Sequence, residues 1–165
     1  MPDKQAHLLV ALLLRYPEIG SVRVLPSASF LNLSFFFRAQ PEEADFDRFR
    51  SRVVQALGLL SRLEGGTDLR QVFMSLRTQG PLWVLDIRRD LSSLVVEEFA
   101  IVLGMVVQAF GNLLVIEKDS DGGEAMIFED DSDIAQGLSQ ARTMQHGEEL
   151  IGFRHDGRVL VFSSV

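Results

Sequence analysis

Arginine is the residue type in this chain with the most distinctive potential for chemistry. The 165 residues include fourteen arginines but only two lysines, Lys4 and Lys118. A guanidinium group binds carboxylates and phosphates through paired hydrogen bonds that a lysine ammonium group cannot make. A biased genomic base composition is the simpler cause of such a ratio. The positions of the arginines therefore matter more than their number.

Four arginines are expected to gather at one edge of a sheet. We predict strands over 30–38, 69–77 and 82–89, and we expect the first and third of these strands to lie side by side and parallel. Arginines at the strand ends would then converge on a site for a small anion: Arg38, Arg70, Arg88 and Arg89. The alternative is that Asp86, Asp90 and nearby glutamates neutralise these arginines in ordinary surface ion pairs.

Two adjacent glutamates, Glu97 and Glu98, interrupt an otherwise apolar helical stretch. Glu97 shares one helix face with Ile101 and Met105, because residues three or four positions apart are neighbours on a helix. A carboxylate in an apolar wall has a raised pKa and could act as an acid or base, so Glu97 is the weak catalytic candidate. Two alternatives stay open. This face could point outward near the helix start, where acids are favoured, or it could be the contact surface of a dimer.

The acidic segment 119–133 holds the weak metal candidates, Asp119, Asp121 and Asp131. A calcium loop of the helix–loop–helix type needs glycine at its sixth position, but that position is Glu124. The flanking segments have the pattern of strands rather than helices. We therefore interpret 118–123 as a solvated hairpin turn and Asp131 as an acid at a helix start, and we expect no metal site.

Other catalytic signatures are absent from the sequence. There is no cysteine, which excludes disulfides, thiol catalysis and thiolate metal sites. The three histidines, His7, His146 and His155, have no partners at metal-ligand spacing apart from Asp156, which lies in the same turn as His155. No phosphate-binding loop, dinucleotide-binding glycine pattern or nucleophile elbow occurs. We expect neither a cofactor nor a catalytic residue beyond the weak candidate Glu97.

The charge balance limits the classes of partner. The formal net charge is −7, whereas a nucleic-acid-binding surface normally leaves a basic balance. The apolar stretch 94–110 is short for a membrane span and contains two glutamates. No secretory signal pattern is evident near the N-terminus. We therefore expect a soluble cytoplasmic protein without a nucleic-acid or membrane partner.

The most apolar part of the chain, residues 94–116, should be the core that positions these groups. It predicts a helix over 94–110, a helix end at Gly111-Asn112, and a short buried strand over 113–116. A helix that is apolar on nearly all sides has to be covered on more than one side. We expect that cover to come from the rest of the chain or from a second copy.

The remaining elements predict a single α+β domain over 1–165. We expect a mostly antiparallel sheet with helices mainly on one face and a ferredoxin-like βαββαβ core over about 30–116. An N-terminal helix over 4–16 and a strand over 21–25 precede this core. A C-terminal extension over about 124–165 would add a strand at 124–128, a helix and the strands 149–154 and 158–163, joined by Asp156-Gly157.

Two functions fit these patterns. The first is a non-enzymatic regulatory or interaction module, homodimeric, that binds a small anionic ligand at the arginine-rich edge. The alternative is a small enzyme that uses buried or clustered carboxylates for acid–base or metal chemistry. A concave site with a buried carboxylate would favour the enzyme, and a flat surface with an apolar two-fold contact would favour the module.

Overall fold

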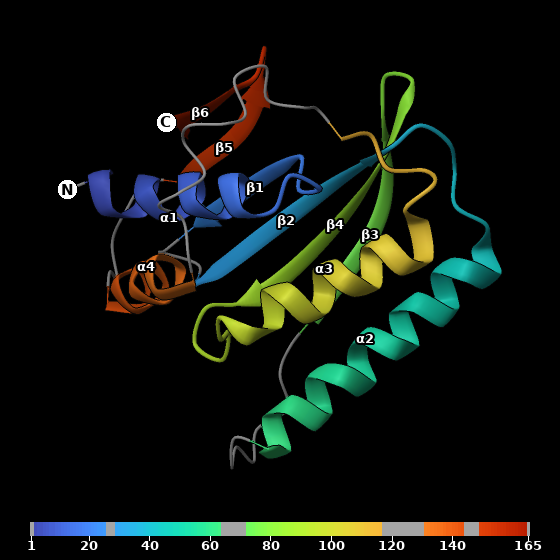
Figure 1. Ribbon diagram of the computed structural model, residues 1–165, viewed down its shortest axis with the longest axis horizontal. Coiled ribbons are helices and arrows are strands. Elements are labelled where there is room, and N and C mark those ends of the chain that lie inside the picture. Colours follow the sequence, from blue (N-terminus) through green and yellow to red (C-terminus); the bar gives the residue numbers. More distant parts are fainter. Residues whose placement is uncertain (1, 26–28, 64–71, 117–130, 144–148, 165) are drawn as a thin grey trace.

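The protein is an α+β structure in which one antiparallel sheet supports a layer of helices (Figure 1). This computed structural model describes residues 2–25, 29–63, 72–116, 131–143 and 149–164. The described helices are α1 (Pro2–Arg15), α2 (Glu43–Leu63), α3 (Glu97–Phe110) and α4 (Asp131–Thr143). The described strands are β1 (Ser21–Leu25), β2 (Phe30–Phe37), β3 (Val72–Gln79), β4 (Leu82–Asp90), β5 (Glu149–His155) and β6 (Arg158–Ser164).

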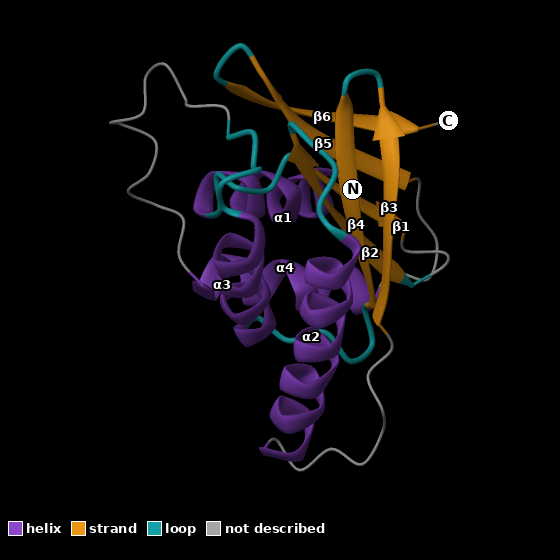
Figure 2. Cartoon of the chain, turned by 90° about the vertical axis from the view of Figure 1, so that its right-hand side faces the viewer, coloured by secondary structure: helices purple, strands orange, loops and turns teal. Residues whose placement is uncertain are grey.

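The six described strands form one sheet in the order β3-β4-β2-β1-β5-β6. All neighbouring strands are antiparallel. The helices lie on one face of this sheet, and the other face carries no described helix (Figures 1 and 2). Side chains that alternate along each strand therefore enter two different environments, a core and an open surface.

β2 shows how the sequence builds these two faces. Its odd-numbered residues are buried large hydrophobics that point towards the helices: Leu31, Leu33, Phe35 and Phe37. Its even-numbered residues, including Asn32 and Ser34, lie on the open face. This alternation confirms the prediction of a sheet with helices against one side.

The helix layer is held by packing of apolar side chains. α1 packs on α4 and lies over β1, β5 and β6, while α2 packs on α3. Phe110 of α3 lies 5.2 Å from Phe37 of β2 and 5.1 Å from Phe49 of α2, measured between ring centroids. Aromatic pairs at such distances stabilise the contact beyond the area that they bury. No described helix is long and apolar enough to cross a membrane.

The predicted parallel arrangement of strands 30–38 and 82–89 is wrong. The two strands are neighbours, but they run antiparallel, with Phe30 opposite Asp90 and Phe37 opposite Trp83. The physical reason is the number of chain reversals. α2 returns the chain so that β3 follows the direction of β2, and the tight turn at Gly80 then sends β4 back.

The ferredoxin-like strand order over 30–116 is not confirmed. That order needs a fourth strand at 113–116 beside the strand 30–37. Here Leu114 forms only an isolated antiparallel bridge to Phe37, and β1 is the neighbour of β2 along most of its length. The predicted strand 124–128 lies outside the described residues.

The apolar stretch 94–116 is covered by the sheet and by α2, and the outer face of its helix is exposed. α3 begins at Glu97, three residues later than predicted, and buries Phe99, Val106 and Phe110 against the core. Its outward face is exposed, with Val107 at 43%. The helix ends at the predicted position, but Gly111 keeps a right-handed conformation (φ −56°), and its N–H donates to the carbonyl of Val107.

Candidate functional site: a polar hollow on the open face of the sheet

The structure does not bring the predicted arginines together. Arg38 follows the end of β2, whereas Arg88 and Arg89 lie near the end of β4, beside the start of β2. Arg88 is exposed on the open face, and Arg89 is buried on the helix face. Arg70 lies outside the described residues. The expected convergence at one edge is therefore wrong for the three arginines that are described, because it rested on parallel strands.

Arg38 stabilises the turn after α3. Its Nε donates to the carbonyl oxygen of Asn112 over 3.0 Å, and its Nη2 donates to the same oxygen. Its backbone N–H donates to the carbonyl of Leu113 over 2.9 Å. These bonds connect the end of β2 to the segment that follows α3.

Arg89 forms a buried ion pair with Glu98. Its Nε lies 2.7 Å from Glu98 Oε2 and its Nη2 lies 2.8 Å from Glu98 Oε1, so the pair is bidentate. The residues are 3% and 1% exposed. Burial alone would lower the pKa of Arg89, but the hydrogen bond and charge of Glu98 outweigh it and raise the pKa. The buried glutamate is thus Glu98, and its observed contact joins α3 to β4.

Asp90 closes the turn between β4 and α3. Its Oδ2 accepts from Ser93 N–H (3.1 Å), Ser93 Oγ (2.7 Å) and Ser92 Oγ (2.8 Å), and its Oδ1 accepts from Arg89. Burial raises the pKa of this carboxyl, but the two serine hydroxyls and Arg89 outweigh burial and lower the pKa to about 2. Arg142 of α4 donates to the carbonyls of Leu91 and Leu94 in the same segment.

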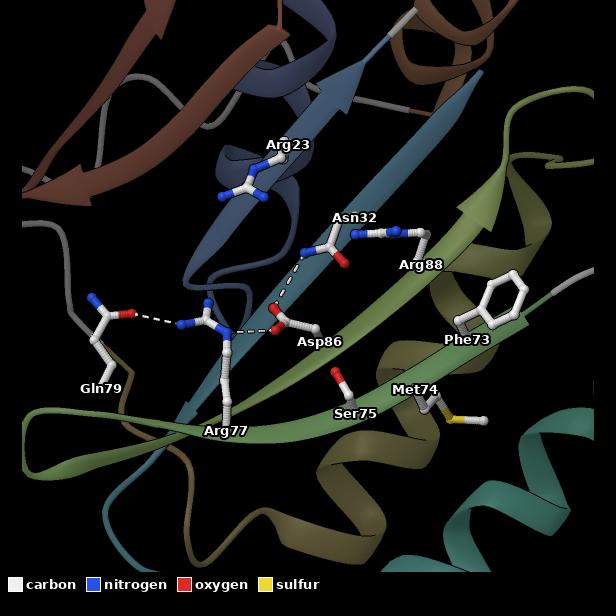
Figure 3. Close-up of a pocket in the computed structure, with 9 residues that line it drawn as sticks. All are labelled: Arg23, Asn32, Phe73, Met74, Ser75, Arg77, Gln79, Asp86 and Arg88. Atoms are coloured by element: carbon white, nitrogen blue, oxygen red, sulfur yellow. Dashed lines mark hydrogen bonds and ion pairs between the residues drawn. The ribbon is translucent and has the colours of Figure 1, made fainter. Parts of the chain in front are cut away.

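A polar hollow of about 540 Å³ lies on the open face of the sheet (Figure 3). Four neighbouring strands, β3, β4, β2 and β1, supply its lining. The lining residues are Arg23, Asn32, Phe73, Met74, Ser75, Arg77, Gln79, Asp86 and Arg88. Three guanidinium groups thus face one carboxylate, in a chain whose net charge is −7.

Asp86 is the centre of a hydrogen-bond network in the hollow. Its Oδ1 accepts from Ser34 Oγ (2.6 Å) and Asn32 Nδ2 (3.2 Å), and its Oδ2 lies 2.6 Å from Arg77 Nε. Figure 3 shows Asn32 and Arg77 reaching this carboxylate from two sides. Burial raises the pKa of Asp86, but Arg77, Ser34 and Asn32 outweigh it and lower the pKa. Asp86 therefore stays ionised, and Arg77 is the arginine that it neutralises.

Arg23 and Arg88 lie on either side of Asn32, because both are register partners of this residue. The guanidinium carbon of Arg88 lies 4.2 Å from the centroid of the Phe30 ring. Stacking on a ring face leaves the in-plane N–H groups of a guanidinium available for a ligand. Arg23 Nε is 3.5 Å from Glu149 Oε2, yet this buried nitrogen has no hydrogen-bond partner in the structure.

Glu97, the weak catalytic candidate, lies on the exposed outer face of α3. Ile101 and Met105 are half-buried on the same helix. Met105 also lines a smaller hollow of about 310 Å³ between α2 and α3, together with Asp45 and Arg48. Of the two glutamates, Glu98 is the one in an apolar wall, and its carboxylate is paired with Arg89.

The side chains of the weak metal candidates lie outside the described part of the structure. Asp119 and Asp121 lie outside this part, and Asp131 begins α4 with its side chain outside it. Among the described residues, no group of three or more acidic or histidine side chains could hold a metal ion.

Arg23, Arg77 and Asp86 are residues of the hollow that the sequence interpretation missed as a site. One signal was available. Asn32 and Ser34 occupy the open-face positions of β2, between Phe30 and Phe36, so a polar centre was visible in that strand. The neighbours of these two residues depend on strand order and register, which the sequence did not supply.

Comparisons with protein-family models, with curated proteins and with solved structures found no match to this chain.

Proposed function

We propose that this chain is a non-enzymatic binding module whose hollow on the open sheet face holds a small anion. The single observation that supports this proposal is the pair of arginines beside Asn32. Arg23 has a buried Nε without a hydrogen-bond partner, and Arg88 is stacked on Phe30 with its edge available. A carboxylate or phosphate group between them would receive donors from two strands at once.

The charge of the hollow favours an anion over a cation. Among the described residues that line the hollow, Asp86 is the one carboxylate, and Arg77 already neutralises it at 2.6 Å. Arg88 then supplies positive charge on one side of the Asn32 amide, and Arg23, which shares its charge with Glu149 at 3.5 Å, supplies N–H donors on the other side. A half-enclosed sheet surface also screens these charges less than open water does.

Acid–base catalysis by the hollow has less support. Asp86 has a lowered pKa and accepts three hydrogen bonds from side chains, so it is a weak base at neutral pH. Glu97 lies on the opposite side of the sheet, on the outer surface of α3. We therefore propose the binding module ahead of the enzyme.

Isothermal titration of the protein with inorganic phosphate and with citrate tests the proposal. We expect saturable binding that weakens as salt is raised, because screening acts on guanidinium–anion contacts. Arg88→Ala and Arg23→Ala should each lower the affinity about tenfold, as expected for the loss of one charged hydrogen bond of ~1.4 kcal/mol.

Arg38→Ala is the matched control, because Arg38 is also an exposed arginine but lies at the other end of β2. It should leave the affinity unchanged. Absence of saturable binding for both anions, or equal loss in Arg38→Ala and Arg88→Ala, would refute an anion site at the hollow.

A further inference from the structure

β3 is an edge strand of the sheet, and the described residues give it little of the usual protection. It is the terminal strand in the sheet order, and no described strand pairs with its outer side (Figure 2). Its eight residues, Val72–Gln79, contain no proline and no lysine, and Arg77 is its one charged residue. Natural sheets usually protect such edges with charges, prolines or bulges, because a bare edge is a template for another strand.

The turn after β3 shows which backbone groups face outward. Gln79 and Leu82 are register partners on either side of a two-residue turn that begins at Gly80, whose φ is +59°. In such a hairpin the flanking pair is hydrogen-bonded, and the pairs then alternate along the strands. The main-chain groups of Met74 and Leu76 are accordingly directed away from β4 and towards the free edge.

The side chains of β3 are compatible with a second strand on that edge. Phe73 is 62% exposed on the open face, which is a large apolar surface for an edge strand. On the helix face, Met74 and Leu76 are only partly buried against the core. The charge of Arg77 is already neutralised by Asp86, so this arginine does not protect the edge as an unpaired lysine would.

We propose that the partner of this edge is the β3 strand of a second copy of the chain, paired antiparallel about a two-fold axis at Ser75. This register is self-complementary. It sets Phe73 of each copy opposite Arg77 of the other, an aromatic–cation pair. It also sets Met74 opposite Leu76, so the helix-side contact is apolar.

Other registers fit less well. Moving the axis to Leu76 sets Arg77 opposite Ser75 and leaves Phe73 opposite Gln79. Moving it to Arg77 places the two arginines directly opposite each other, where like charges destabilise the pair. The chosen register also uses most of the strand, from Val72 to Thr78.

The helix layer provides a second observation on the same side of the molecule. α2 is the outermost helix on the β3 side, and it carries exposed Val54, Leu59 and Leu63 (Figure 1). Pairing of the β3 edges would continue the sheet into the second copy and bring that copy's helix layer to the same side. The pairing would also make the open rims of the two hollows adjacent. The proposal rests on β3 and does not require the anion site.

Disulfide trapping tests the register directly, because the chain has no cysteine of its own. A residue on the two-fold axis faces its own copy, so Ser75→Cys should form a covalent dimer on mild oxidation. Ser163→Cys is the matched control, since Ser163 is exposed on β6 at the opposite edge of the sheet. It should remain monomeric on a non-reducing gel. Equal cross-linking of the two variants, or none in Ser75→Cys, would overturn the proposal.

Ser75→Lys separates loss of the dimer from loss of the fold. In one copy the new lysine lies opposite Asp86 on β4, which favours the folded chain, whereas two lysines repel each other across the axis. Native mass spectrometry should show the wild type as a dimer and Ser75→Lys as a monomer with unchanged circular dichroism. A monomeric wild type, or a dimer that survives Ser75→Lys, contradicts the pairing.

Discussion

Arg88 and Arg89 are consecutive residues on β4, yet they belong to different parts of the protein's chemistry. Arg89 points towards the helices, is 3% exposed and forms a bidentate pair with Glu98. Arg88 points to the open face and stacks on Phe30. The comparison teaches that the side of the sheet, rather than the residue type, decides whether an arginine is structural or available to a ligand.

The largest effect should come from breaking the buried pair. Glu98→Ala leaves the guanidinium of Arg89 buried without its main counter-charge, which should cost about 3–5 kcal/mol of unfolding free energy. Urea denaturation measures this cost. Glu97→Ala removes the exposed neighbour and should change stability by less than ~0.5 kcal/mol. Equal stability of Glu98→Ala and Glu97→Ala would contradict the difference between the buried and the exposed face of α3.

The next effect should appear as a loss of stability in acid. Asp90, with a pKa of about 2, and Asp86, whose pKa is also lowered, bind protons less readily in the folded chain than in the unfolded chain, where an aspartate has a pKa of ~3.9. Their stabilising contribution is therefore complete above about pH 4–5 and is lost as the pH falls towards about 2.

Asp90 is partly exposed, so we expect its protonation to lower the free energy of unfolding by ~1–2 kcal/mol between pH 5 and pH 2. Thermal melts between pH 5 and pH 2 measure it. Asp90→Asn should be less stable at pH 5 and should have a flatter pH profile. A profile as steep as that of the wild type would show that Asp90 is not the responsible group.

A smaller effect is expected from Asp86→Asn, which removes the charge but keeps the shape of the residue. The ion pair with Arg77 is partly exposed, so its loss should cost about 1 kcal/mol or less. Anion affinity should rise about fivefold, because removing a charge roughly 8 Å from the ligand is worth ~1 kcal/mol at an effective dielectric constant of about 40. Titration with phosphate measures this change in anion affinity. Weaker binding by Asp86→Asn than by the wild type would contradict the proposed electrostatics.

The smallest effect on stability should come from Arg88→Ala. Its stacking on Phe30 is an exposed cation–aromatic contact worth about 0.5 kcal/mol. Denaturation and phosphate titration of the same sample should therefore diverge, with a nearly unchanged unfolding midpoint and a clear loss of affinity. A loss of stability as large as that of Glu98→Ala would remove the distinction between the two neighbouring arginines.

The local sequence pattern predicted much of the secondary structure, because hydrophobic periodicity and helix ends depend on residues that are close in sequence. The strand 21–25 has the predicted bounds, and α3 ends at the predicted residue, Phe110. The direction and register of the strands were harder to predict, since they depend on chain reversals that are far apart in the sequence. The error about the direction of β4 relative to β2 placed Arg38 beside Arg88 when the two lie at opposite ends of β2.

The hollow could not be predicted for the same reason. Asn32 and Asp86 are 54 positions apart, and their contact follows from the pairing of β2 with β4. The adjacent glutamates show a different limit. Both lie in the first turn of α3, and only the rotation of the helix on the sheet makes Glu98 the buried member.

The position of β1 between β2 and β5 has a consequence for synthesis of the chain on the ribosome. Arg154 of β5 donates to the carbonyl of Ile19, 135 positions earlier, so the middle of the sheet is closed by segments made far apart in time. Until β5 emerges from the ribosome, a nascent chain that has already folded β1 and β2 would expose two surfaces. One is the edge of β1 that later pairs with β5, and the other is the apolar face of α1. Assembly from such distant contacts is slow, and this interval is when the protein would depend most on chaperones.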